Sequence, residues 1–193
     1  MSAVAEFHER DEAHYARYSR IDIDRIGLWL FLFSESMLFL GLLASRFYLQ
    51  GTYRPEALSQ TLGLTITTML LLSSLTAYRA ETAITHDDQS AFLQNTLFTL
   101  GLGVIFLAGV AYEWSQAFVH FPPSTAFGTV FFSMTGTHAL HVLSGVLLLA
   151  LLYWNGRRGK YGAANHWAPE AIVKYWHMVD VVWVFFYAAL YLV

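Results

Sequence analysis

The sequence contains no cysteine, and only 13% of its 193 residues are charged. The missing cysteines exclude disulfides, iron–sulfur clusters and zinc sites with thiolate ligands. Soluble domains have about 25% charged residues, so this chain has about half of the charge that a water-exposed surface normally carries. The net charge of −3 gives no excess of basic residues for binding nucleic acid. The composition therefore excludes an ordinary soluble domain and a nucleic-acid partner.

Apolar residues are abundant instead. The chain is 56% hydrophobic and 17% aromatic, and its mean hydropathy is +0.44. A bilayer core of about 30 Å is crossed by a helix of about 20 apolar residues. Five segments satisfy this length, and none shows the alternation of polar and apolar residues that marks barrel strands. The sequence therefore predicts an all-α membrane protein, a polytopic bundle with five transmembrane helices near residues 26–49, 58–77, 92–118, 127–154 and 172–193.

The eleven basic residues predict how these helices are oriented. Two of them, Arg46 and Arg54, fall on one side of the membrane, and the other nine fall on the side of the N-terminus. Cytoplasmic loops carry the excess of Lys and Arg, so we expect a cytoplasmic N-terminus and a C-terminus outside. The nine are Arg10, Arg17, Arg20, Arg25, Arg79, Arg157, Arg158, Lys160 and Lys174.

The chain divides into two regions by composition. Residues 1–24 are polar and of mixed charge, and they lack the basic start and apolar run of a cleavable secretory signal. We interpret them as a cytoplasmic tail. Residues 25–193 form the five-helix transmembrane domain.

Glu35 is an acidic residue inside the first predicted span. A charge at the centre of a bilayer costs about 2.5–3.5 kcal/mol. Glu35 lies about 13 Å from the cytoplasmic end of its helix, and that helix offers it no partner within one turn. Two interpretations remain open: a role in lipid contact or proton handling, or a neutral carboxyl group hydrogen-bonded to a neighbouring helix.

Five further polar side chains lie within the predicted spans: Glu113, His138, His141, His177 and Asp180. Such side chains often form hydrogen bonds between transmembrane helices, worth about 0.6–2 kcal/mol for each pair. We therefore favour a structural intramembrane polar network. A bis-histidine haem needs imidazoles on opposed helices, but His138 and His141 are nearly level on one helix and only His177 could face them. We expect no metal ligand and no catalytic residue among these groups.

Two longer motifs resemble the haem–copper oxidase subunit III family. Residues 132–145, which contain Thr-Gly-Thr-His-Ala-Leu-His-Val, are similar to the family's Thr-Gly-x-His-x-x-His-Val run. Residues 175–183 match its Tyr-Trp-His-Phe-Val-Asp-x-Val-Trp run, with Met178 in place of phenylalanine. Glu35 resembles the family's intramembrane glutamate, and residues 111–114 resemble its acidic–aromatic step. The resemblance extends over about residues 25–193 and is to the shorter, five-helix form of the family.

The resemblance implies a non-redox subunit of a terminal oxidase that reduces oxygen and pumps protons in aerobic respiration. Haem and copper are then expected in partner subunits I and II, with none bound by this chain. The expected task is to pack on subunit I, hold phospholipid, and sustain proton uptake and turnover stability, in a prokaryotic plasma membrane. Longer members hold phospholipid in a cleft between their first two helices and the rest, and this chain lacks that wall of the cleft.

Several alternatives stay open at this point. Within the family, the oxidase could take electrons from cytochrome c or from a quinol, and a related subunit accompanies nitric oxide reductases. Outside the family, a small proton channel or transporter would use Glu35, His138 and Asp180 as a relay. A membrane b-type cytochrome would use the histidines as haem ligands.

Overall fold

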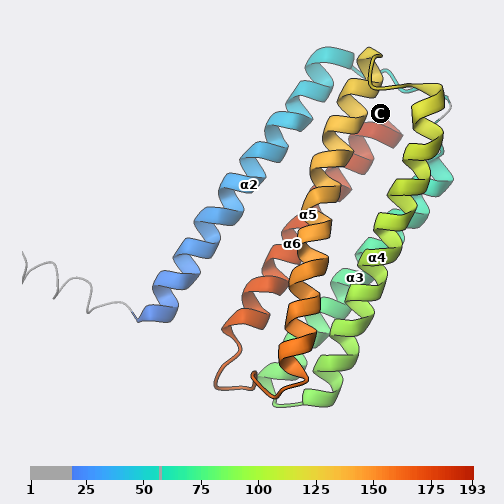
Figure 1. Cartoon of the computed structure of the whole chain (residues 1–193). Helices are drawn as coiled ribbons and strands as arrows, with labels where there is room; N and C mark the ends of the chain where they lie inside the picture. Colours follow the sequence, from blue (N-terminus) through green and yellow to red (C-terminus); the bar gives the residue numbers. More distant parts are fainter. Residues whose placement is uncertain (1–18, 57) are drawn as a thin grey trace, which may run out of the picture.

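The computed structural model describes residues 19–56 and 58–193 and consists of five long helices in this part of the chain (Figure 1). All five are long and apolar enough to cross a membrane, which confirms the predicted all-α, five-helix class. The helices are α2 (Arg20–Gln50), α3 (Gln60–Thr85), α4 (Gln89–His120), α5 (Ala126–Gly156) and α6 (Trp167–Tyr187), and α6 continues into a π-helical turn, η1 (Ala188–Leu192).

Helix α2 begins earlier than the hydrophobic run that it contains. Ser19 and Asp22 form a capping box, in which each side chain accepts a hydrogen bond from the backbone N–H of the other residue. This arrangement satisfies two N–H groups that the helix itself leaves unpaired. Residues 20–24 of the predicted polar tail therefore belong to α2, while residues 1–18 lie outside the described part of the chain.

The helix α2 stands at one edge of the bundle. It packs against α5 and α6, and in Figure 1 it diverges from α5 toward its N-terminal end. Only 11% of the residues in its most apolar stretch are buried, compared with 50% in α6. The peripheral position leaves most of α2 available to lipid or to other subunits.

The core of the bundle is organised around Trp176 of α6, which has no exposed surface. Its indole N–H donates to the hydroxyl of Ser73 on α3, at 2.9 Å. A Cβ atom on Gly103 of α4 or on Gly145 of α5 would lie 2.7 Å from an atom of this ring. Ser73 and the two glycines therefore form a slot between α3, α4 and α5. The flat indole ring of Trp176, from α6, fills this slot.

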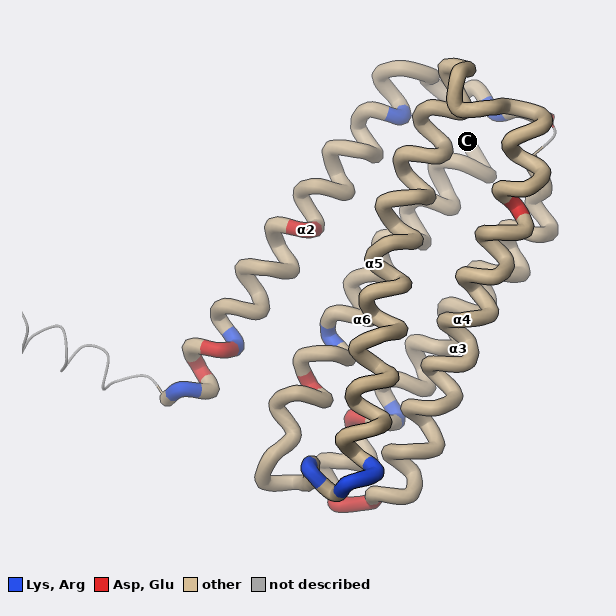
Figure 2. The backbone as a smooth tube through the Cα atoms, viewed as in Figure 1, with Lys and Arg blue, Asp and Glu red and all other residues tan. Residues whose placement is uncertain are grey.

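Charged residues separate along the bundle axis. Seven of the nine described Lys and Arg residues lie at the end that holds the start of α2, and Arg46 and Arg54 lie toward the other end (Figure 2). The loops at the first end are tied together, because the carboxylate of Asp87 accepts a hydrogen bond from the backbone N–H of Ala163 at 2.6 Å. The separation agrees with the predicted orientation, whose assignment to cytoplasm and outside stays a prediction.

Candidate functional site

Glu35 and His141 form a polar pair between α2 and α5. The carboxyl oxygen Oε2 of Glu35 lies 3.0 Å from Nε2 of His141. The other ring nitrogen of His141, Nδ1, lies 2.8 Å from the backbone carbonyl oxygen of Thr137. A carbonyl oxygen only accepts, so Nδ1 carries a hydrogen and Nε2 faces the carboxyl group. One further proton joins the pair, either on the carboxyl oxygen or on Nε2.

An aromatic ring and two hydroxyl groups lie around the Glu35–His141 pair. The ring of Phe39 meets the imidazole of His141 edge-on, with 4.7 Å between centroids. The hydroxyl of Tyr175 lies 2.6 Å from that of Ser144 and donates to the backbone carbonyl of His141 at 3.2 Å. The side chains of Glu35 and His141 are 23% and 19% exposed. The pair is thus held firmly on three helices and still reaches the surface of the bundle.

This geometry answers one of the questions left by the sequence. Helix α2 itself offers Glu35 no partner, and the partner comes from α5. The contact is of the kind expected in the second interpretation, a carboxyl group bonded to a neighbouring helix. A role of Glu35 in lipid contact or proton handling stays a prediction.

The other intramembrane polar groups go to separate partners. Nε2 of His138 lies 3.1 Å from the carbonyl oxygen of Val179, and Nδ1 of His177 lies 2.6 Å from the hydroxyl of Ser74. The three histidines therefore do not converge on one point. Within residues 19–56 and 58–193, no three His, Asp or Glu side chains lie close enough to hold a metal ion together.

The two remaining acids also lie apart from the Glu35 pair. Glu113 accepts a hydrogen bond from the hydroxyl of Tyr191 through Oε2, at 2.5 Å, and its Oε1 is buried without a partner. Both carboxyl oxygens of Asp180 are buried and have no hydrogen-bond partner among the described residues. Of the six polar residues that the sequence singles out, the structure joins only Glu35 and His141 directly.

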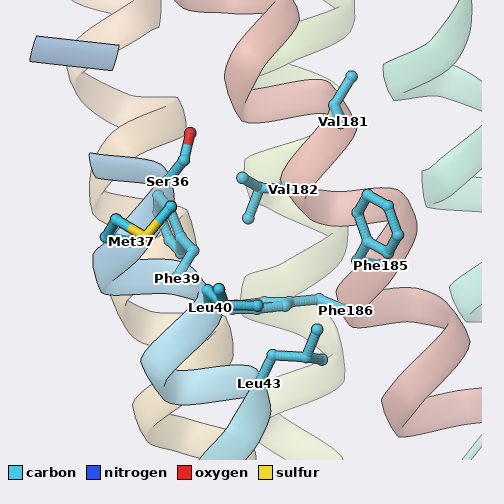
Figure 3. Close-up of a pocket in the computed structure, with 9 residues that line it drawn as sticks. All are labelled: Ser36, Met37, Phe39, Leu40, Leu43, Val181, Val182, Phe185 and Phe186. Atoms are coloured by element: carbon cyan, nitrogen blue, oxygen red, sulfur yellow. The ribbon is translucent and has the colours of Figure 1, made fainter. Parts of the chain in front are cut away.

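A groove runs between α2 and α6, and the sequence did not reveal it. It consists of two adjoining cavities of about 310 and 450 Å³, both lined by Ser36, Val181 and Val182. In the first cavity Val182 and Phe186 of α6 point toward α2, and apart from Ser36 all lining side chains are apolar (Figure 3). The second cavity extends toward the N-terminal end of α2 and includes Lys174 and His177.

The comparisons with known proteins agree with the motifs. The family model described as cytochrome c oxidase subunit III matches residues 20–193. Cytochrome c oxidase subunit 3 of Thermostichus vulcanus is 35% identical over 177 residues, which cover 89% of this chain and 88% of that protein. The subunit 3 of Synechocystis sp. is 32% identical, with 94% and 80% covered. That of Tragelaphus imberbis is 30% identical, with 86% and 68% covered.

Proposed function

Because the chain belongs to the cytochrome c oxidase subunit III family, we propose that it packs on subunit I of its oxidase, binds lipid, and sustains proton uptake and turnover stability. As subunit III of a haem–copper oxidase it is part of a membrane-embedded oxidoreductase complex and has other oxidase subunits as partners. The observation that carries the proposal is the family match over residues 20–193, which includes both intramembrane motifs.

We place the redox chemistry in the partner chains, with haem and copper on subunits I and II. The lack of cysteine supports this assignment, since a thiolate-bridged copper centre cannot be built here. The histidines support it too, because His138, His141 and His177 bond to different groups of the bundle. No residue of this chain is assigned a catalytic role.

The lipid part of the proposal concerns the α2–α6 groove. The lining of the first cavity is apolar apart from Ser36, the second cavity adds Lys174 and His177, and the two cavities adjoin along the helix axes. An elongated apolar groove that faces a bilayer suits an acyl chain. In a five-helix member, α6 and the peripheral α2 would then supply both walls of a lipid site.

The proton part of the proposal concerns Glu35 and His141. Their shared proton can lie on either side chain with no change in the positions of heavy atoms. A pair of this kind at the bundle surface can accept and release protons near the uptake region of subunit I. The side chain of Glu35 is 23% exposed, which supports exchange of a proton with groups outside this chain.

Replacing Glu35 with alanine is expected to leave the oxidase assembled but to speed its inactivation several-fold during sustained turnover. The Glu35→Gln variant is the matched control for packing, because its amide can donate to Nε2 of His141 without supplying a titratable proton. Both variants should inactivate faster if the proton matters, and only the alanine variant if the contact alone matters. An assembled alanine variant with the wild-type inactivation rate would refute the role.

The electron donor is proposed to be cytochrome c, since the curated relatives are named cytochrome c oxidase subunit 3. A quinol oxidase, or an accessory role in a nitric oxide reductase, is the alternative within the family. The prokaryotic relatives support a prokaryotic plasma membrane as the location.

Purification of the chain from its native membrane in mild detergent tests the whole proposal. Haem and copper should co-purify in stoichiometric amounts on partner chains, and the preparation should oxidise reduced cytochrome c faster than quinol. The reverse preference would identify a quinol oxidase. A stable, colourless, metal-free chain without partners would contradict the proposal and favour a channel or transporter.

A further inference from the structure

Tyr191 and Glu113 form a buried pair that the proposed function does not use. The phenolic hydroxyl of Tyr191, in η1, donates to Oε2 of Glu113, in α4, at 2.5 Å. Tyr191 has no exposed surface, and Glu113 is 4% exposed. Hydrogen bonds from a hydroxyl group to an ionised carboxylate are about 2.5–2.7 Å long. The distance therefore fits a phenol that is already in contact with a base for its proton.

The acceptor distinguishes Tyr191 from the other hydrogen-bonded aromatic side chains. Trp183 donates to the hydroxyl of Thr67 at 2.9 Å, and Tyr175 donates to the backbone carbonyl of His141. Among the tyrosines and tryptophans of residues 19–56 and 58–193, Tyr191 alone donates to a carboxylate. A phenol loses an electron most easily when a base takes its proton at the same time, because the phenol radical cation is a very strong acid. An oxidising equivalent in this part of the bundle therefore settles on Tyr191.

Tyr187 connects the buried ring to the surface of the bundle. It lies four residues before Tyr191, and the π-helical turn stacks the two rings with 5.2 Å between centroids and 25° between planes. Tyr187 is half-buried. Both rings lie against Gly63 of α3, where a Cβ atom would be 2.6 Å from an atom of Tyr191 and 3.2 Å from one of Tyr187. Packing thus holds the rings in contact, so an electron can pass from Tyr191 to the surface.

Glu113 has a polar route of its own to the outside. It lines a cavity of about 290 Å³ at the end of α4, together with the exposed residues Ser59, Gln116 and His120. No lysine, arginine or second carboxylate lines this cavity. A proton that Glu113 receives from Tyr191 therefore stays beside polar groups and is not shut inside an apolar core.

We propose that Tyr191 is a redox-active residue that gives one electron to strong one-electron oxidants, with Glu113 as its proton acceptor and Tyr187 as the contact at the surface. The oxidants are species of the hydroxyl-radical class, derived from partly reduced oxygen. This activity goes beyond the function proposed above and is separate from the catalytic electron transfer assigned to the partner subunits.

The electrons and protons of the reaction balance. The oxidant takes one electron from Tyr187, and a hydroxyl radical thereby becomes hydroxide. Tyr191 returns that electron to Tyr187, and the phenolic proton of Tyr191 moves to Oε2 of Glu113. The pair, which carried one negative charge, becomes a neutral tyrosyl radical and a neutral carboxyl group. One electron from a reductant and return of the proton from Glu113 restore the phenol.

Electron paramagnetic resonance of the purified oxidase tests the proposal. The complex is oxidised with photochemically generated tris(bipyridine)ruthenium(III) and frozen rapidly. The wild type should give a tyrosyl radical signal that becomes narrower when the tyrosines are ring-deuterated, and Tyr191→Phe should lower the radical yield several-fold. The matched control is Tyr175→Phe, which removes the hydroxyl of another buried tyrosine. Tyr175 has no carboxylate acceptor, so this variant should keep the wild-type yield.

The variant Glu113→Gln tests the role of the base. Its amide oxygen can still accept a hydrogen bond from Tyr191, but an amide takes up a proton far less readily than a carboxylate does. The radical yield should therefore fall several-fold in a complex that still assembles. A merely structural role of Glu113 would leave the radical yield of this assembled variant unchanged.

Two outcomes would contradict the proposal. Equal radical yields in the wild type and in Tyr191→Phe would overturn the assignment of Tyr191. A yield that is lost in Tyr191→Phe but kept in Glu113→Gln would refute Glu113 as the proton acceptor. If Tyr191→Phe does not assemble, the double variant Tyr191→Phe/Glu113→Met removes donor and acceptor together and leaves neither of them unpaired. The double variant should assemble and show the same low yield, and a wild-type yield in it would overturn the proposal.

Discussion

Replacing Trp176 with alanine is expected to destabilise the folded subunit by about 3–5 kcal/mol, the cost of removing a fully buried tryptophan. The indole fills the slot between Gly103, Gly145 and Ser73, where a Cβ atom on either glycine would lie 2.7 Å from an atom of the ring. The bundle is held by close contact and not by exclusion of water, so the lost dispersion contacts are not recovered elsewhere. The measurement is the midpoint of thermal unfolding of the oxidase in detergent, together with the yield of assembled complex.

The matched control is Trp154→Ala. Trp154 is 57% exposed and stacks with the guanidinium group of Arg158 at 4.9 Å, so its loss should leave the midpoint nearly unchanged. The variant Gly145→Val adds a side chain on the α5 side of the same slot. It should destabilise the folded subunit as strongly as Trp176→Ala does, because the valine side chain would overlap the indole ring. Equal midpoints for the two tryptophan variants would contradict the central role of the slot.

Replacing Arg46 with methionine is expected to destabilise the folded subunit at the end of the bundle where α2 ends. The expected cost is about 1–3 kcal/mol for each carbonyl group that loses its donor. The side chain of Arg46 is fully buried, and its Nη1 donates to the carbonyl of Gly51 at 2.7 Å. Its Nη2 donates to the carbonyl of Tyr53 at 2.8 Å and lies 3.5 Å from that of Val193. The guanidinium group thus fastens the loop after α2 to the end of η1. Thermal unfolding in detergent should show a clear decrease in the midpoint.

Two further variants make this prediction specific. Arg46→Lys should recover only part of the loss, because an ammonium group cannot reproduce the planar fork that serves carbonyls in different directions. Arg158→Met, at an exposed position near the other end, should have almost no effect on the midpoint. A midpoint for Arg46→Met equal to that of Arg158→Met would show that the buried contacts contribute nothing.

The helices could be predicted from the sequence because bilayer thickness sets their length, but their ends could not. Hydropathy marks only the hydrocarbon core, and helices continue past it where caps and polar residues allow. Helix α3 extends to Thr85 instead of residue 77, and α6 begins at Trp167 instead of residue 172. Pro169 lies in the first turn of α6, where proline is well tolerated.

The sequence predicts one residue of the candidate site but not its partner. Glu35 stands out because a charged residue in a bilayer is costly, and that argument needs no structure. Its partner, His141, lies 106 residues away, so the pairing depends on how α2 packs against α5. From the sequence alone, Arg46 indicates only a charge that sets topology. An arginine one turn before the end of an apolar helix is also placed to donate to the carbonyl groups that follow the helix, and this signal could have predicted its buried contacts.

The slot for Trp176 has a consequence for the order in which this protein is made. Helices α2 to α5 leave the ribosome before α6, so the membrane then contains an intermediate of four of the described helices, with an open notch at Gly103 and Gly145. The packing around the two glycines is therefore completed only when α6 arrives and Trp176 fills the notch.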